Sequence, residues 1–107
     1  FIFEDNTIQP YTKIGNNTIL WSGNHIGHHT IVGEHCFISS HTVISGSCKV
    51  GNNVFIGVNS TLYDGIIIGD KSLIGAGAII SKNTKPKSVY IESPTKLFSK
   101  DSEKIGF

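Results

Sequence analysis

Residues 44–80 read ISGSCKVGNNVFIGVNSTLYDGIIIGDKSLIGAGAII, and an aliphatic residue returns at every sixth position of this stretch. The same spacing extends upstream, so that each sixth residue from Ile2 to Ile80 is Ile, Leu or Val. A period of six fits neither the helical period of about 3.6 residues nor the alternation of a half-buried strand. A repeat this regular predicts a solenoid of stacked, nearly identical units.

The other positions of the hexad follow rules of their own. Glycine directly follows the aliphatic residue in seven of the fourteen hexads, where little side-chain bulk is tolerated. Three positions after the aliphatic residue stand residue types that tolerate positive φ, which predicts one tight turn per hexad: Asp5, Asn17, Gly23, His29, His35, His41, Asn53, Asn59, Gly65, Gly77 and Asn83. The fourth position is mostly small, as a narrow triangular interior requires.

This pattern, written [LIV]-G-x-N-[STAVC]-x, resembles that of the hexapeptide-repeat acyltransferases over residues 2–84. The resemblance implies an all-β fold, a left-handed parallel β-helix with three flat faces and eighteen residues per coil. The left hand is implied by the resemblance alone, since the usual rule for parallel crossovers gives a right hand. Fourteen hexads correspond to about four to five coils.

The chain of 107 residues is expected to hold one solenoid domain over residues 1–85 and a C-terminal extension or cap over residues 86–107. Pro86 and Pro94 break the repeat in the second segment. A solenoid of so few coils has two open ends and little interior. We therefore expect it to need oligomerisation or capping for stability.

Composition excludes several classes of function. A net charge of +1 without a basic stripe argues against nucleic-acid binding. The chain shows no secretion signal and no apolar run of membrane-span length, so we expect a cytoplasmic location. Cys36 and Cys48 fall at the small inward position, which favours buried apolar residues over a disulfide or a metal pair.

Outward positions eighteen residues apart form three columns. The first is apolar at every level and predicts a surface that packs against other subunits, in a homotrimer as the resemblance implies; coverage by the C-terminal tail is the alternative. Its members are Phe1, Ile19, Phe37, Phe55, Leu73 and Ile91, with Ile19, Phe37, Phe55 and Leu73 as the predicted interface. The second column runs Thr7, His25, Val43, Thr61, Ile79, and the third Lys13, Ile31, Lys49, Ile67, Lys85.

All five histidines lie between residues 25 and 41. His29, His35 and His41 occupy the turn position of the hexad, where a backbone preference explains each of them. His25 sits at an outward strand position, and His28 sits on a turn with Gly46 stacked above it. The glycine leaves room beside the imidazole of His28.

In the sialic acid O-acetyltransferase and bacterial amino-sugar N-acetyltransferase branch, the catalytic histidine lies five residues before a repeat glycine. His28 matches it, five residues before Gly33. The resemblance implies that His28 is a general base, and imidazole chemistry suits that role. His25 and His29 are further candidate catalytic residues. The branch usually has Asp or Glu next to this histidine, whereas this chain has His29. Glu34 or an acidic group of another subunit are the candidates to replace it.

The stretch from residue 56 to residue 84 resembles the C-terminal coils that bind acetyl-CoA in these enzymes. Small residues allow close backbone approach to a pantetheine arm, and lysines provide charge-assisted donors for a phosphate. The candidates are Gly57, Asn59, Gly75, Ala76, Gly77, Lys82 and Lys85. Each also has a plain structural explanation. Pro94 and Lys96 keep the end of the family pattern, while Glu92 and Ser93 replace its usual glycine and asparagine.

The sequence therefore predicts an acyl-CoA-dependent acetyltransferase acting on an amine or hydroxyl of a sugar or nucleotide sugar. Acetyl-CoA would be the co-substrate, held between subunits, and no metal is expected. One alternative is a non-catalytic trimeric scaffold. Another is a zinc enzyme similar to the hexapeptide-repeat carbonic anhydrases, which use one histidine well separated from a later pair, although no histidine follows His41 here.

Overall fold

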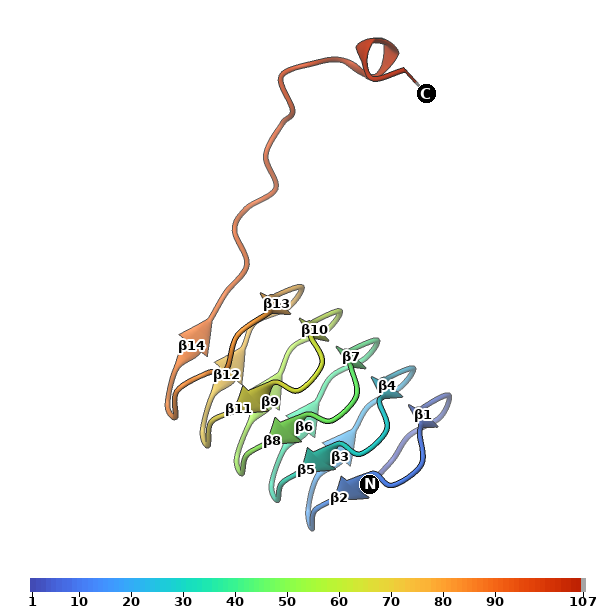
Figure 1. Cartoon of the computed structure of the whole chain (residues 1–107), viewed down its shortest axis with the longest axis vertical. Coiled ribbons are helices and arrows are strands. Elements are labelled where there is room, and N and C mark those ends of the chain that lie inside the picture. The colour runs from blue at the N-terminus through green and yellow to red at the C-terminus, as the bar shows by residue number, and fades with distance from the viewer. Residues whose placement is uncertain (107) are drawn as a thin grey trace.

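A computed structural model describes residues 1–106, within which fourteen strands of two residues each wind into a left-handed parallel β-helix of about five turns (Figure 1). Consecutive strands lie on different faces, and each pairs with the strands one coil away. Within residues 1–106 the strands pair in parallel and join residues eighteen apart until the last coil. The predicted fold class is confirmed.

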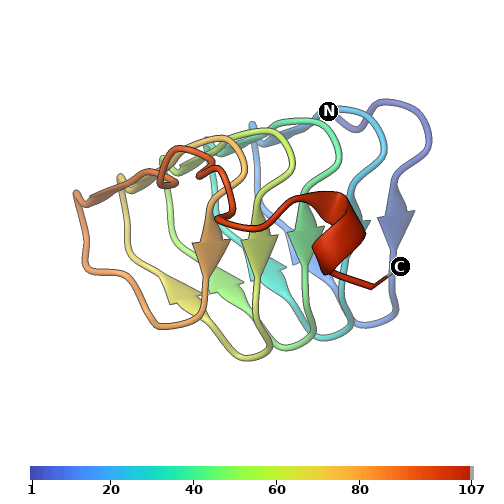
Figure 2. The same cartoon turned by 90° about the horizontal axis from the view of Figure 1, so that it is seen from above.

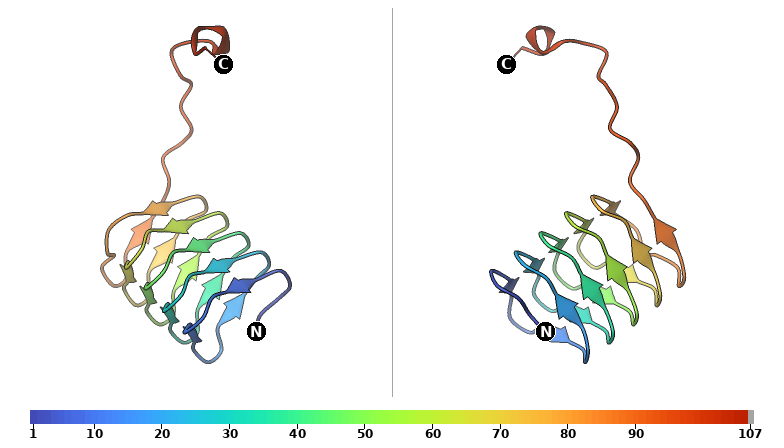
Figure 3. Two further views of the ribbon diagram at one scale, coloured as in Figure 1. Left: turned by 45° about the vertical axis from the view of Figure 1, so that its right-hand side comes forward. Right: turned by 180° about the vertical axis from the view of Figure 1, so that it is seen from behind.

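Three parallel sheets form the faces of the solenoid, as the two views of Figure 3 make visible. The His25 sheet contains β1 (Thr7–Ile8), β4 (His25–Ile26), β7 (Val43–Ile44), β10 (Thr61–Leu62) and β13 (Ile79–Ile80). The Lys13 sheet contains β2 (Lys13–Ile14), β5 (Ile31–Val32), β8 (Lys49–Val50) and β11 (Ile67–Ile68). The Phe37 sheet contains β3 (Ile19–Leu20), β6 (Phe37–Ile38), β9 (Phe55–Ile56), β12 (Leu73–Ile74) and β14 (Val89–Tyr90).

The aliphatic position of each hexad points into the core. From Leu20 to Ile80 every one of these side chains is buried, and only Ile2, Ile8 and Ile14 at the first open end are partly exposed. Small polar side chains share this interior and bond to backbone oxygens of the next coil, as Thr18 does to Gly33 at 2.7 Å. Within residues 1–106 no buried side-chain nitrogen or oxygen lacks a partner.

The predicted turns are present, with one correction. Positive φ occurs at every position predicted for it except Asn83, and it also occurs at Tyr11, Ser47 and Lys71. The glycines that follow the aliphatic position serve another purpose, close stacking of coils. A Cβ added at Gly27 would lie 2.5 Å from the backbone nitrogen of Gly46.

The last coil is two residues shorter than the others. Leu73 pairs with Val89, sixteen residues later, so Val89 continues the apolar column and the expected Ile91 does not. The strand β14 lies past residue 85, so parallel pairing continues into the segment predicted as an extension. A short turn around Lys87, which has a φ of 60°, takes the place of the regular hexad.

Residues 91–106 run away from the end of the solenoid as an exposed tail with one 3₁₀ turn, η1 (Ser102–Lys104), shown in Figures 1 and 2. The tail does not cover the apolar column, since Phe55 and Leu73 keep exposures of 43% and 42%. Two members of the column form an aromatic stack, because the ring centroids of Phe37 and Phe55 lie 5.5 Å apart and the ring planes are within 6° of parallel.

Candidate functional site

His28 lies on the turn that joins β4 to β5, at the edge between the His25 and Lys13 sheets. Its backbone N–H donates to Oε1 of Gln9 in the coil below, at 2.9 Å. Its carbonyl oxygen accepts the backbone N–H of Ser47 in the coil above, at 2.8 Å. The backbone of His28 is therefore held from both neighbouring coils while its side chain remains exposed.

The imidazole of His28 lies against the backbone of Gly46. A Cβ added at Gly46 would come within 2.7 Å of Nε2 and 2.8 Å of Cε1 of this ring. Gly46 itself is buried. The space that the sequence predicted beside His28 is thus occupied by the ring.

His29 forms a pair with His28. Their Nδ1 atoms are 3.0 Å apart, which is hydrogen-bond distance, and the ring planes are nearly perpendicular at 87°. On its other side, the His29 ring stacks on Tyr11, with centroids 5.0 Å apart and planes within 24° of parallel. His29 adopts the predicted positive φ, 59°, and so does Tyr11 one coil below.

The structure brings His28 and His29 together but leaves His25 apart from them. His25 is half-buried on β4, and within residues 1–106 no hydrogen bond or ring contact joins it to the other two. Glu34 does not replace the missing acidic neighbour of His28. It follows β5 on the opposite side of the Lys13 sheet, where its backbone N–H donates to Oδ1 of Asn52 at 2.9 Å.

Gln9 and Tyr11 complete this site, and we did not predict them from the sequence. Both lie one coil below the histidines, Gln9 eighteen residues before Gly27 and Tyr11 eighteen before His29. The Gln9 side chain reaches the next coil and accepts the backbone N–H of His28. The eighteen-residue spacing was therefore the signal that would have located both.

The residues predicted to bind acetyl-CoA divide between two edges of the His25 sheet. The glycine-rich set lies at its edge with the Phe37 sheet and consists of Gly57, Asn59, Gly75, Ala76 and Gly77. Lys82 follows β13 and lies on the same edge as His28, three coils away, or about 14 Å at the usual strand spacing. Lys85 is exposed beyond the last regular coil.

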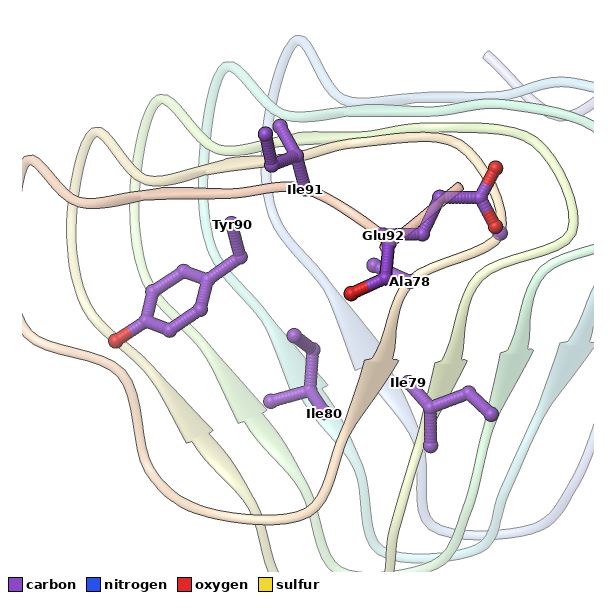
Figure 4. A pocket seen from close by; sticks show the side chains of 8 residues that line it. Ala78, Ile79, Ile80, Tyr90, Ile91 and Glu92 are labelled. Atoms are coloured by element: carbon purple, nitrogen blue, oxygen red, sulfur yellow. The ribbon is translucent and has the colours of Figure 1, made fainter. Parts of the chain in front are cut away.

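Two open pockets flank β13 at the C-terminal end of the solenoid and share Ile79, Ile80 and Tyr90 as lining residues. One, of about 370 Å³, also contains Gly77, and the other, of about 340 Å³, contains Lys82. Figure 4 shows the first pocket, with the side chains of Tyr90, Ile80 and Glu92 among those around it. One predicted cofactor residue from each edge, Gly77 and Lys82, therefore lines a pocket at this end of the molecule.

Glu92 occupies one place where the family pattern has glycine. Its carboxylate lies over Gly77, so that a Cβ added there would be 2.6 Å from Oε2. Gly77 has a φ of 71°, which L-residues rarely adopt. Glu92 therefore adds an acidic group beside a residue predicted to contact acetyl-CoA.

The two cysteines are buried free thiols, as the sequence predicted. The Cys36 thiol donates to the carbonyl oxygen of Gly51 at 3.0 Å, and the Cys48 thiol to that of Tyr63 at 3.2 Å. Burial is the largest cause that raises the pKa of both thiols above the ordinary value. Neither thiol is therefore suited to act as a nucleophile at neutral pH.

Two further features concern metals and membranes. Within residues 1–106, no three side chains of His, Cys, Asp or Glu gather closely enough to hold a metal ion. The described part of the chain also contains no helix with the length and apolar character needed to cross a bilayer.

The fold is similar to that of several solved acyltransferases. Serine acetyltransferase isoform 3 from Entamoeba histolytica, in complex with cysteine, matches with a TM-score of 0.73 and 21% identity, over 92% of this chain and 40% of the other. A histidine-to-asparagine variant of perosamine N-acetyltransferase from Caulobacter crescentus, in complex with CoA and GDP-perosamine, matches with a TM-score of 0.70 and 18% identity. This match covers 90% of this chain and 54% of the other. An aspartate-to-alanine variant of AntD, an N-acyltransferase from Bacillus cereus in complex with dTDP and coenzyme A, matches with a TM-score of 0.59 and 17% identity. This match covers 94% of this chain and 81% of the other.

The chain spans about half the length of the first two of these structures. No curated protein sequence matches it. The family model described as bacterial transferase hexapeptide (six repeats) matches residues 11–46 and 47–82, which is more than half of the chain. Together with the three-faced solenoid of hexapeptide repeats, this match shows that the chain belongs to the bacterial transferase hexapeptide family.

Proposed function

We propose that this chain is an acyl-CoA-dependent acetyltransferase that transfers an acetyl group to an amine or hydroxyl of a sugar or nucleotide sugar. Membership of a transferase family supports the reaction class. The fold shared with enzymes studied in complex with CoA and a nucleotide or nucleotide sugar supports the choice of substrates. The observation that carries the proposal is the exposed His28 ring, held by its backbone on one edge of the solenoid.

His28 would act as the general base. As the amine or hydroxyl attacks the thioester carbonyl, its proton passes to Nε2 of His28 while the new C–N or C–O bond forms. The C–S bond then breaks, and the imidazolium returns the proton to the departing thiolate to give CoA. An imidazole suits both proton transfers near neutral pH.

The C-terminal coils would hold acetyl-CoA. Lys82 lies on the same edge as His28, so an extended pantetheine arm along that edge would run between a phosphate-binding lysine and the base. Gly46 has no side chain along this path, and the His28 ring fills the space beside it. Glycine-rich turns on the other edge would contact the arm of a molecule bound against a neighbouring subunit.

A homotrimer would complete the site. His28 is exposed on one subunit, and the two pockets described above lie at the C-terminal end of the solenoid. In the apolar column, Phe55 and Leu73 are exposed while Ile19 and Phe37 are half-buried, which supports burial of this face between subunits. A second subunit packed there would form a cleft along the glycine-rich edge, which borders the Phe37 sheet, and the His28 facing that cleft would be that of the neighbouring subunit.

Thermal-shift measurements with acetyl-CoA, CoA and nucleotide amino sugars test the proposed substrates. A ligand that binds only the folded state raises the unfolding temperature by an amount that grows with the ratio of its free concentration to its dissociation constant. We expect acetyl-CoA and CoA to stabilise the protein, with an additional shift from the correct acceptor. If no acyl-CoA shifts the unfolding temperature, the chain is a structural solenoid and the proposed activity is wrong.

A further inference from the structure

We infer that His29 positions His28 through a hydrogen bond between their Nδ1 atoms, so that this enzyme uses an imidazole where an acidic residue would be the usual partner of the base. The inference rests on the proposed function, because it assigns His28 the role of base. It concerns a positioning residue, since His29 acts on the reaction through His28.

The geometry limits the protonation of the pair. Two Nδ1 atoms 3.0 Å apart form a hydrogen bond only when one carries a proton and the other offers a lone pair. If both carried protons, two N–H groups would face each other and repel. One Nδ1 proton is therefore shared between His28 and His29.

The direction of the bond decides which nitrogen can act as the base. If His28 donates from Nδ1, its Nε2 carries the lone pair, and this nitrogen lies over Gly46 at the exposed edge. If His29 donates instead, neutral His28 is protonated at Nε2 and cannot accept a proton there. Base catalysis therefore requires His28 to be the Nδ1–H tautomer, with His29 as the acceptor.

Tyr11 keeps His29 in place for this purpose. The tyrosine ring stacks on the face of the His29 ring at a centroid distance of 5.0 Å, and the His28 ring meets His29 nearly at a right angle. The turn backbone adds to this order, because both His29 and Tyr11 adopt positive φ at equivalent positions of successive coils. His29 therefore presents its Nδ1 to His28 from a supported position.

Two substitutions at residue 29 separate the hydrogen bond from the stacking. His29→Phe keeps a flat ring on Tyr11 but removes the acceptor, and Tyr11 itself shows that an aromatic residue fits this turn. His29→Asn places Oδ1 at the same position along the side chain as Nδ1 and tolerates positive φ. His35→Phe is the matched control, because His35 has the same turn conformation and bonds to Asn17 instead of His28.

The direct test is a long-range ¹H–¹⁵N NMR spectrum of the full chain with labelled histidines, at about pH 8, where imidazoles are neutral. We expect His28 to be the Nδ1–H tautomer in the unsubstituted protein and in His29→Asn. We expect it to change to the Nε2–H tautomer in His29→Phe. An Nε2–H tautomer in the unsubstituted protein, or no change in His29→Phe, would overturn the inference.

Acetyl transfer from acetyl-CoA provides the second readout. His29→Phe should lower kcat by about tenfold or more without changing KM for acetyl-CoA, whereas His29→Asn should retain most of kcat and His35→Phe all of it. An equal kcat in His29→Phe would contradict the positioning role. If the NMR result is as expected but no variant transfers an acetyl group to any acceptor, the positioning stands and the proposed function is wrong.

Discussion

The imidazole of His28 rests on the backbone of Gly46 in the next coil, and a Cβ on that glycine would come within 2.7 Å of Nε2. The two residues stand eighteen apart, at equivalent turn positions of successive coils. The His28 ring can therefore take its present position only because residue 46 has no Cβ. Its φ lies outside the left-handed region, so alanine is compatible with the backbone there.

Gly46→Ala should displace the His28 ring and lower kcat by about tenfold or more, with little change in stability, because an exposed ring can move. Initial rates of acetyl transfer and the unfolding temperature measure the two effects. Gly65→Asn is the control, since a Cβ at Gly65 meets nothing within 4 Å and asparagine accepts its φ of 70°. Full activity in Gly46→Ala would show that the ring position is unimportant.

Phe37→Asp combined with Phe55→Asp should prevent the proposed trimer from forming, because carboxylates buried in an apolar interface would lose their hydration. Light scattering coupled to gel filtration gives the mass of the assembly. Val43→Asp, an exposed position on the His25 sheet, is the control and should leave the mass unchanged. A stable trimer in the double variant would rule out this face as the interface.

The buried thiols should make the fold sensitive to alkaline pH. Burial raises the pKa of Cys36 and Cys48 in the folded state, so the folded protein binds these protons more tightly than the unfolded chain. The stabilising contribution is complete below the unfolded thiol pKa, near the ordinary value of 9.0, and is lost as pH rises through the folded value.

Urea unfolding at about pH 7 and about pH 10 measures this loss. The free energy of unfolding should fall between the two values in the unsubstituted protein. It should fall less in the double variant Cys36→Ala, Cys48→Ala, which has no thiols to ionise. Equal falls in both proteins would attribute the alkaline sensitivity to other groups.

Lys82→Ala should weaken binding of CoA but not of its 3′-dephospho form, because the proposed lysine contact is with the 3′-phosphate. Calorimetry with the two ligands measures both dissociation constants. Lys49→Ala, which removes an exposed charge from the Lys13 sheet, is the control for a general effect of charge. An equal loss for both ligands would assign Lys82 to a different part of CoA or to none.

The repeat explains why the core and the turns were predictable from the sequence. A strict period assigns each side chain an inward, outward or turn position. The burial of every sixth residue from Leu20 to Ile80 and the positive φ of His29, His35 and His41 follow directly. The prediction fails where the period ends. The sixteen-residue step from Leu73 to Val89 depends on how the chain turns around Lys87, which no repeat specifies.

The candidate site was only partly predictable for a different reason. The room that Gly46 leaves for His28 follows from the eighteen-residue spacing. The contact between the Nδ1 atoms of His28 and His29 depends on side-chain rotamers, and the support from Gln9 and Tyr11 depends on how far those side chains reach. The residue spacing alone specifies neither the rotamers of these side chains nor how far they reach.

The proposal that His28 is the base of an acetyltransferase is tested most directly by comparing acetyl transfer in the unsubstituted protein and in His28→Ala. The measurement is release of the CoA thiol from acetyl-CoA in the presence of nucleotide amino sugars, with the oligomeric state of both proteins checked beforehand. We predict transfer by the unsubstituted protein and a loss of about 10²- to 10⁴-fold in kcat for the variant. Full activity in His28→Ala would contradict the account.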